Sequence, residues 1–72
     1  MISFEMSDTE QLEIYLDRLG LADFLAQIKL LDDHKTDHVH LMPESWGGSH
    51  LEDEPVNASA KVIRHVKIIM RE

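Results

Sequence analysis

The sequence HVHLMPESWGG, residues 38–48, has the most uneven composition in this chain. It contains two of the five histidines, the only tryptophan and two of the three glycines. Alternation along 38–42 places His38, His40 and Met42 on one face of a strand and two aliphatic residues on the other. The pattern predicts a short strand that leads directly into a turn.

The turn itself is marked by Pro43, which removes a backbone donor and ends the strand. Trp46 then precedes Gly47 and Gly48, whose lack of a Cβ permits a positive φ or a close approach to other backbone. Two interpretations of the tryptophan stay open: an aromatic anchor on a binding surface, or a cap on a small hydrophobic core. Two glycines alone do not make a phosphate-binding loop.

The N-terminal residues predict a strand followed by a helix. Residues 2–6 alternate apolar and polar side chains, as a half-buried strand does. Ser7 followed by Glu10 three residues later fits a capping box, and acidic residues near this point suit the positive end of a helix dipole. We therefore expect a helix to begin near Ser7.

The region from residue 8 to residue 31 contains two apolar stripes when it is projected as a helix. Leu12 and Leu16 belong to one stripe, and the later leucines, Phe24 and an isoleucine belong to another that lies nearly opposite. Two helices, 8–19 and 21–31, separated at Gly20, would each bury one stripe. The alternative is one continuous helix that is buried on both sides.

The C-terminal part predicts two further strands. Residues 37–42 form one, and residues 60–70, which are rich in β-branched side chains, form the other. We expect these strands to be antiparallel neighbours joined by the turn-rich, acidic segment 43–58. The resulting fold class is α+β: a single small βααββ domain over residues 1–72, with a three-stranded, mainly antiparallel sheet and helices packed on one face.

Size and charge restrict the possible functions. A chain of 72 residues without cysteine has a small core and no disulfide to support it, so we expect a homodimer. Fourteen acidic residues against seven lysines and arginines give a net charge of −7, which argues against nucleic-acid binding and favours a basic protein partner. The N-terminus has neither a basic region nor a long apolar run, so we expect a cytoplasmic protein with no signal peptide and no membrane association.

The histidines allow a metal-binding alternative. His38 and His40 point the same way from one strand, and His65 on the next strand or His50 in the loop would add a third imidazole. The competing interpretation is that these histidines are hydrogen-bonded surface or interface residues.

Catalysis finds weaker support in the sequence. Ser45 and Ser49 lack the context of a nucleophile elbow, and Asp37 precedes His38 directly, where strand alternation would turn the two side chains apart. A chain of this size also has little room for a pocket that excludes water. We therefore expect no enzymatic activity and no cofactor.

Four segments together resemble the immunity protein 32 family: Asp37–Met42, Ser45–Gly48, Leu51 and Ile63–Ile68. That family consists of small bacterial proteins predicted to neutralise the toxins of polymorphic toxin systems. The family pattern falls on His40, Leu41, Met42, Trp46, Gly47, Gly48, His65, Val66 and Lys67. The resemblance implies a bacterial immunity protein that inhibits a toxin.

Together these observations predict a cytoplasmic, immunity-type protein that acts by stoichiometric binding to a basic toxin domain, without catalysis. Trp46 would supply the apolar anchor and the acidic loop the electrostatic steering. The predicted contact residues are His38, His40, Trp46, Gly47, Gly48, Glu52, Asp53 and Glu54. Two alternatives remain: a metal-binding protein using His38, His40 and His65, or a structural homodimer whose histidines tune assembly with pH.

Overall fold

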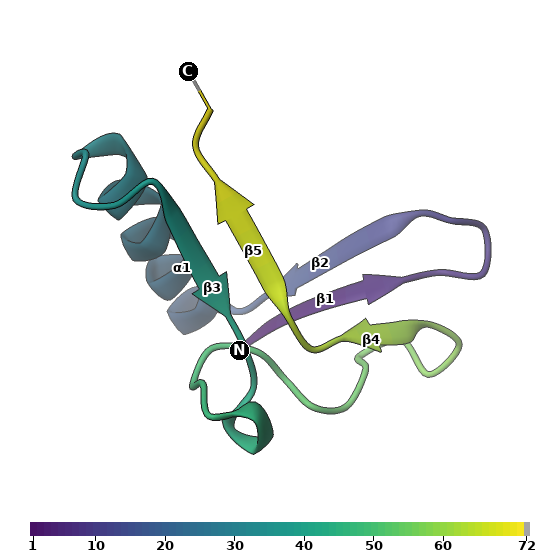
Figure 1. Ribbon diagram of the computed structural model, residues 1–72. Coiled ribbons are helices and arrows are strands. Elements are labelled where there is room, and N and C mark those ends of the chain that lie inside the picture. The colour runs from purple at the N-terminus through teal and green to yellow at the C-terminus, as the bar shows by residue number, and fades with distance from the viewer. Residues whose placement is uncertain (72) are drawn as a thin grey trace.

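The computed structural model describes residues 1–71, and five strands and one α-helix make up the fold (Figure 1). In chain order the elements are β1 (Ile2–Met6), β2 (Leu12–Leu16), α1 (Arg18–Asp32), β3 (His38–Leu41), the 3₁₀ turn η1 (Glu44–Trp46), β4 (Lys61–Ile63) and β5 (Val66–Ile69). Two antiparallel sheets result, one ordered β2-β1-β4 and one consisting of β3 and β5. The predicted α+β class with a mainly antiparallel three-stranded sheet is confirmed.

The predicted helix over residues 8–19 is wrong, because β1 continues into a hairpin with β2. Ser7 closes the hairpin turn: its backbone N–H donates to the carbonyl of Gln11 at 2.9 Å, and its hydroxyl accepts from the Gln11 N–H at 3.0 Å. Glu10 takes a left-handed conformation with φ 63°. Leu12 and Leu16 also fit a period of two, which is the period that the structure uses.

The helix α1 begins at Arg18, three residues before the predicted helix over 21–31. Asp17 caps it, accepting a hydrogen bond from the Gly20 N–H at 2.7 Å. Gly20 does not break the helix; it lies in the first turn with its Cα against the carbonyl of Met1, where a Cβ would lie 1.8 Å from that oxygen. The predicted helix over 21–31 is thus part of α1, whose 15 residues fall short of a membrane span, as does every other helical stretch in residues 1–71.

The final strand is also divided. Residues 61–63 form β4 and pair with β1, whereas residues 66–69 form β5 and pair with β3. The break at Arg64 and His65 carries the chain from one sheet to the other, so the two sheets lie at an angle (Figure 1). The predicted antiparallel pairing of the 37–42 strand with the last strand is confirmed, with His38 opposite Ile69 and Leu41 opposite Val66.

The hydrophobic core lies where the two sheets meet α1. Ile2, Phe4, Leu41 and Leu51 form its buried centre. Phe24 of α1 packs edge-on against Phe4 at a ring-centroid distance of 6.0 Å. The core is small and excludes much of the β1–β2 hairpin.

A buried carboxylate occupies the other face of β1. Glu5 is fully buried and accepts hydrogen bonds from the Ser3 hydroxyl, the Val56 N–H at 2.6 Å and the Asn57 N–H at 3.0 Å. Burial alone would raise the pKa of Glu5, but these three hydrogen bonds outweigh it and hold the pKa below 4.5. Glu5 therefore fastens the irregular segment before β4 to the sheet.

Candidate functional site

The loop that follows β3 folds back on itself, and hydrogen bonds between backbone groups that are close in sequence hold it. The Pro43 carbonyl accepts from the N–H groups of Trp46 and Gly48 at 3.0 and 2.9 Å, and the Glu44 carbonyl accepts from Gly47 at 3.0 Å. Gly47 has φ 87°, a left-handed conformation that side chains of L-residues rarely adopt. The glycine at this position therefore sets the end of the 3₁₀ turn that carries Trp46.

The second glycine allows the loop to lie against the end of β3. A Cβ at Gly48 would lie 2.3 Å from the carbonyl oxygen of Met42, a separation no real side chain adopts. That same oxygen accepts from the N–H groups of His50 and Leu51 at 3.1 and 3.2 Å, and Glu52 donates to the carbonyl of Ile2 at 2.9 Å. The loop backbone is thereby fixed to β3 at one end and to β1 at the other.

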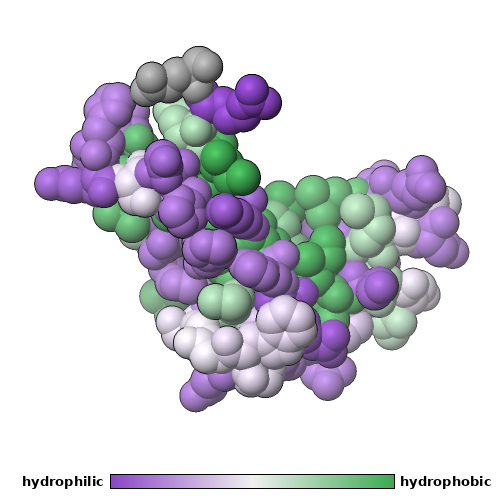
Figure 2. All heavy atoms as spheres, in the orientation of Figure 1, coloured by the Kyte–Doolittle hydropathy of each residue, from purple (hydrophilic) through white to green (hydrophobic). Residues whose placement is uncertain are grey.

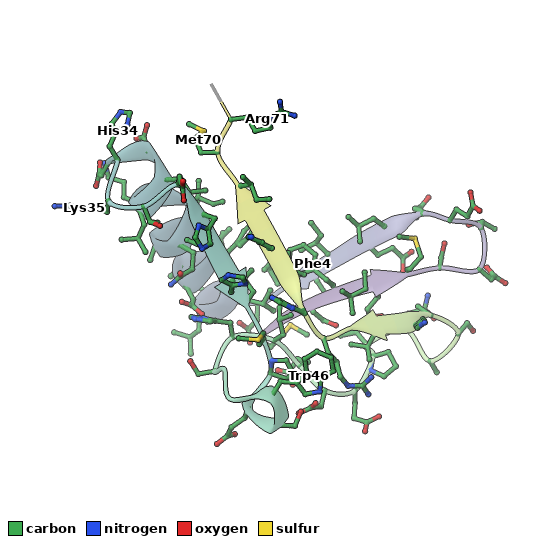
Figure 3. All side chains as sticks on the ribbon, in the orientation of Figure 1. Phe4, His34, Lys35, Trp46, Met70 and Arg71 are labelled. Carbon is green, nitrogen blue, oxygen red and sulfur yellow. The ribbon has the colours of Figure 1, made fainter. Side chains whose placement is uncertain are left out.

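Trp46 lies on the 3₁₀ turn η1 of this fixed loop (Figure 3). Its side chain is 56% exposed, so it does not cap the core. Pro43 and Leu51 are the buried residues of the loop, and Leu51 joins the core cluster. Of the two interpretations of the tryptophan, the structure fits the surface one.

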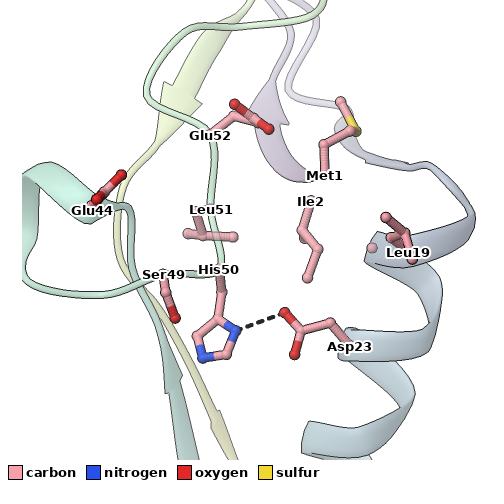
Figure 4. A pocket seen from close by; sticks show the side chains of 10 residues that line it. Met1, Ile2, Leu19, Asp23, Glu44, Ser49, His50, Leu51 and Glu52 are labelled. Atoms are coloured by element: carbon pink, nitrogen blue, oxygen red, sulfur yellow. Dashed lines mark hydrogen bonds and ion pairs between the residues drawn. The ribbon is translucent and has the colours of Figure 1, made fainter.

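A hollow of about 560 Å³ lies between this loop and the first turns of α1 (Figure 4). Carboxylates of Asp23, Glu44 and Glu52 line it, together with apolar side chains from the N-terminus and α1. The Nδ1 atom of His50 lies 2.8 Å from a carboxylate oxygen of Asp23 and so links the two walls. No sequence pattern pointed to this contact, because the two residues are 27 positions apart.

The acidic segment after the loop divides into free and engaged carboxylates. Glu52 and Glu54 are exposed. Asp53 instead accepts from the Ser45 hydroxyl and lies 3.6 Å from Nε of Arg64, whose guanidinium also donates to the Asp53 carbonyl at 3.2 Å. Asp53 therefore ties the loop to the break between β4 and β5, and Glu52 and Glu54 are the carboxylates available for steering.

The predicted histidine cluster forms on the outer face of the β3–β5 sheet. His40 Nδ1 lies 2.8 Å from His65 Nε2, and the rings of His38 and His40 meet edge-to-face with centroids 5.1 Å apart. The prediction that Asp37 and His38 turn apart is wrong: Asp37 lies before the strand, and its carboxylate is 2.7 Å from His38 Nδ1.

Within residues 1–71 no three His, Cys, Asp or Glu side chains are arranged to hold a metal ion. Burial lowers the pKa of His40, and repulsion from His65, His38 and Lys67 lowers it further, so the neutral ring that forms the hydrogen bond is favoured. The three imidazoles thus form a surface cluster joined by one hydrogen bond, between His40 and His65, and one ring contact, between His38 and His40.

The predicted contact residues fall into two groups: the histidines on β3 and the residues of the loop that carries Trp46. The ring of His40 contacts those of His38 and His65, and no ring contact joins these imidazoles to Trp46 within residues 1–71. The serine hydroxyls that make side-chain hydrogen bonds do so with Glu5, Thr9 and Asp53, not with an imidazole.

Comparison with family models, with curated proteins and with solved structures finds no match to this chain. The resemblance to the immunity protein 32 family therefore stays a prediction, carried by the residues that suggested it.

Proposed function

We propose that this protein acts by stoichiometric binding of another protein, without catalysis, through a loop surface made of Trp46, Glu44, Glu52 and Glu54. The observation that carries the proposal is an exposed tryptophan on a backbone that is fixed from both ends. The resemblance to immunity proteins supplies the kind of partner: a basic toxin domain, met in the bacterial cytoplasm.

The physical case begins with Trp46. A tryptophan that is 56% exposed leaves a large apolar area in water, and the burial of this area in a partner's pocket contributes favourable binding free energy. Because the Met42 and Pro43 carbonyls already hold the loop, little conformational entropy is lost when a partner binds. Tryptophans in such positions are the residues most often found to dominate binding energy.

The exposed carboxylates of the same loop favour a basic partner. Glu44, Glu52 and Glu54 are exposed near Trp46 in sequence, and the whole chain carries a net charge of −7. Charges at the rim of an interface raise the association rate more than the affinity, and salt weakens their effect. His38 and His40 belong to the separate imidazole cluster and are not part of the proposed surface.

The test is capture of a partner from the native host with tagged wild-type protein, followed by calorimetric titration of the isolated partner. Trp46→Ala is compared with Val56→Ala, because Val56 is 51% exposed and lies outside the loop. We expect one partner per chain, a loss of about 2 kcal/mol or more for Trp46→Ala, and little change for the control. Equal affinity of wild type and Trp46→Ala would show that the loop surface is not the binding site.

A further inference from the structure

One face of the β2-β1-β4 sheet is apolar but only partly covered. The cross-strand pairs Ile2–Leu16, Phe4–Ile14 and Met6–Leu12 place all six side chains on this face. Packing against α1 buries the β1 residues Ile2 and Phe4. Met6, Leu12, Ile14 and Leu16, which we call the open apolar face, are between 37% and 50% exposed.

Apolar side chains are also exposed on α1 and after β5. Leu25, Ile28 and Leu31 of α1 and Met70 after β5 line a groove of about 470 Å³, together with the charged residues Lys29 and Asp32. Apolar atoms gather in the angle between β5 and the β1–β2 hairpin (Figure 2). The core of this chain is therefore open on one side.

The overall dimensions agree with an unfinished core. The accessible surface is 5167 Å², whereas a compact monomer of 8.3 kDa exposes about 4,600 Å². The radius of gyration is 12.5 Å, compared with about 11 Å for a compact chain of this length. The excess of roughly 600 Å² approaches the ~800 Å² that each partner contributes to a stable interface.

Charge on this face also suits self-association. The acidic residues of β1 and β2, Glu5 and Glu13, form a cross-strand pair on the opposite face of the sheet. Lys61, paired with Met6, is the charged strand residue on the apolar side. Two copies can therefore meet here without opposing carboxylates, despite the net charge of −7.

We propose that a second copy of this chain covers the open apolar face, the two hairpins packing face to face about a two-fold axis. An isologous contact needs one self-complementary patch, and a patch of aliphatic side chains without acidic groups meets that need. Homodimer interfaces are more apolar than the contacts of transient partners, whereas a basic partner would find no carboxylate among the four side chains of the open apolar face. The contact lies outside the loop surface, so the dimer would present two copies of Trp46.

The experiment measures molar mass by light scattering and sedimentation from low micromolar to millimolar concentration. The wild-type protein is compared with Ile14→Glu and with Leu19→Glu, because Leu19 is 81% exposed and lies on α1, outside the open apolar face. We expect twice 8.3 kDa for wild type and Leu19→Glu at high concentration, and 8.3 kDa for folded Ile14→Glu. A wild-type monomer at every concentration would overturn the proposal.

A second measurement keeps the proposal testable if Ile14→Glu does not fold. In a mixture of isotope-labelled and unlabelled wild-type protein, magnetisation transfer between copies is recorded. Transfer between the methyl groups of Leu12 or Ile14 and the unlabelled copy is the expected result. A dimer that shows transfer only at other residues would place the contact elsewhere and overturn the assignment.

Discussion

The loop around Trp46 and the open apolar face of the β1–β2 hairpin are both exposed, but for different physical reasons. In the loop, backbone hydrogen bonds and two glycines fix the chain, and the one aromatic side chain, Trp46, is exposed. On the hairpin, regular strand alternation gathers aliphatic side chains that α1 is too short to cover. The first surface is specific and charged, and the second is extended and uncharged apart from one lysine.

This difference indicates what each surface can recognise. An aromatic anchor with an acidic rim discriminates among partners, since charge and shape must both match. An aliphatic face has little to discriminate with, so it suits a permanent contact in which the partner is identical. Variants that change one surface and leave the other intact can separate the two roles.

The largest effect is expected for Glu5→Ala, which detaches the segment that follows the loop. The variant leaves the N–H groups of Val56 and Asn57 without their acceptor in a buried place, and we expect a loss of about 3 kcal/mol in the free energy of unfolding. Thermal unfolding measures it, with Glu54→Ala as an exposed control. Dimer formation should persist under conditions in which the variant is folded. A smaller loss of unfolding free energy for Glu5→Ala than for Glu54→Ala would contradict the role of Glu5.

The same carboxylate predicts an acid dependence. Its pKa in the folded protein lies below 4.5, so the stability it contributes is present above its unfolded pKa and is lost as the pH falls through the folded value. Unfolding free energies measured on the acid side should fall more steeply for wild type than for Glu5→Gln. Parallel curves for the two proteins would show that Glu5 is not held as a carboxylate.

An intermediate effect is expected for Gly48→Ala, which acts on the loop alone. The new Cβ would meet the Met42 carbonyl at 2.3 Å, and relieving that clash should cost roughly 1–3 kcal/mol and displace Trp46. Gly47→Asn is the matched variant, because asparagine tolerates a positive φ and nothing lies within 4 Å of a Cβ there. Denaturant unfolding should show that Gly48→Ala is less stable than Gly47→Asn. The reverse order would mean that the positive φ at Gly47 restricts the loop more than the close approach of Gly48 to the Met42 carbonyl.

The smallest effect is expected at the histidine cluster, which belongs to neither surface. Because the pKa of His40 is lowered in the folded protein, the unfolded chain binds the proton more readily, so stability should decline as the pH falls from the unfolded pKa of this histidine toward its folded pKa. The groups that oppose protonation are His65, His38 and Lys67. His40→Asn should show less of this decline than His34→Asn, an exposed control, when unfolding is followed across mildly acidic pH; equal curves would exclude His40 as the source.

Predictions from the sequence were correct where a local pattern of side chains determines the structure. They were wrong where tertiary contacts decide between two secondary structures that fit the same pattern. Alternation along 38–42 correctly placed Val39 and Leu41 on the face opposite the histidines, and the structure buries both; of the two candidates for a third imidazole, His65 is the one beside His40. Leu12 and Leu16 satisfy a helical and a strand period equally, and the pairing with β1 decides between them.

The remaining differences concern contacts between distant residues. The burial of Glu5 depends on N–H groups more than fifty positions away, and the link from Asp23 to His50 crosses from α1 to the loop. No periodicity records such contacts. The sequence also allowed Trp46 to lie in the core. In the structure Leu51 belongs to the core cluster instead, and Trp46 is exposed.

The most direct test of two separate surfaces uses Trp46 as the only tryptophan in the chain. Acrylamide quenching of its fluorescence is measured from concentrations at which the protein is monomeric to those at which it is dimeric. The account predicts strong quenching that does not change with concentration, because Trp46 is exposed and lies outside the self-association face. Weak quenching throughout, or quenching that declines as the protein is concentrated, would contradict it.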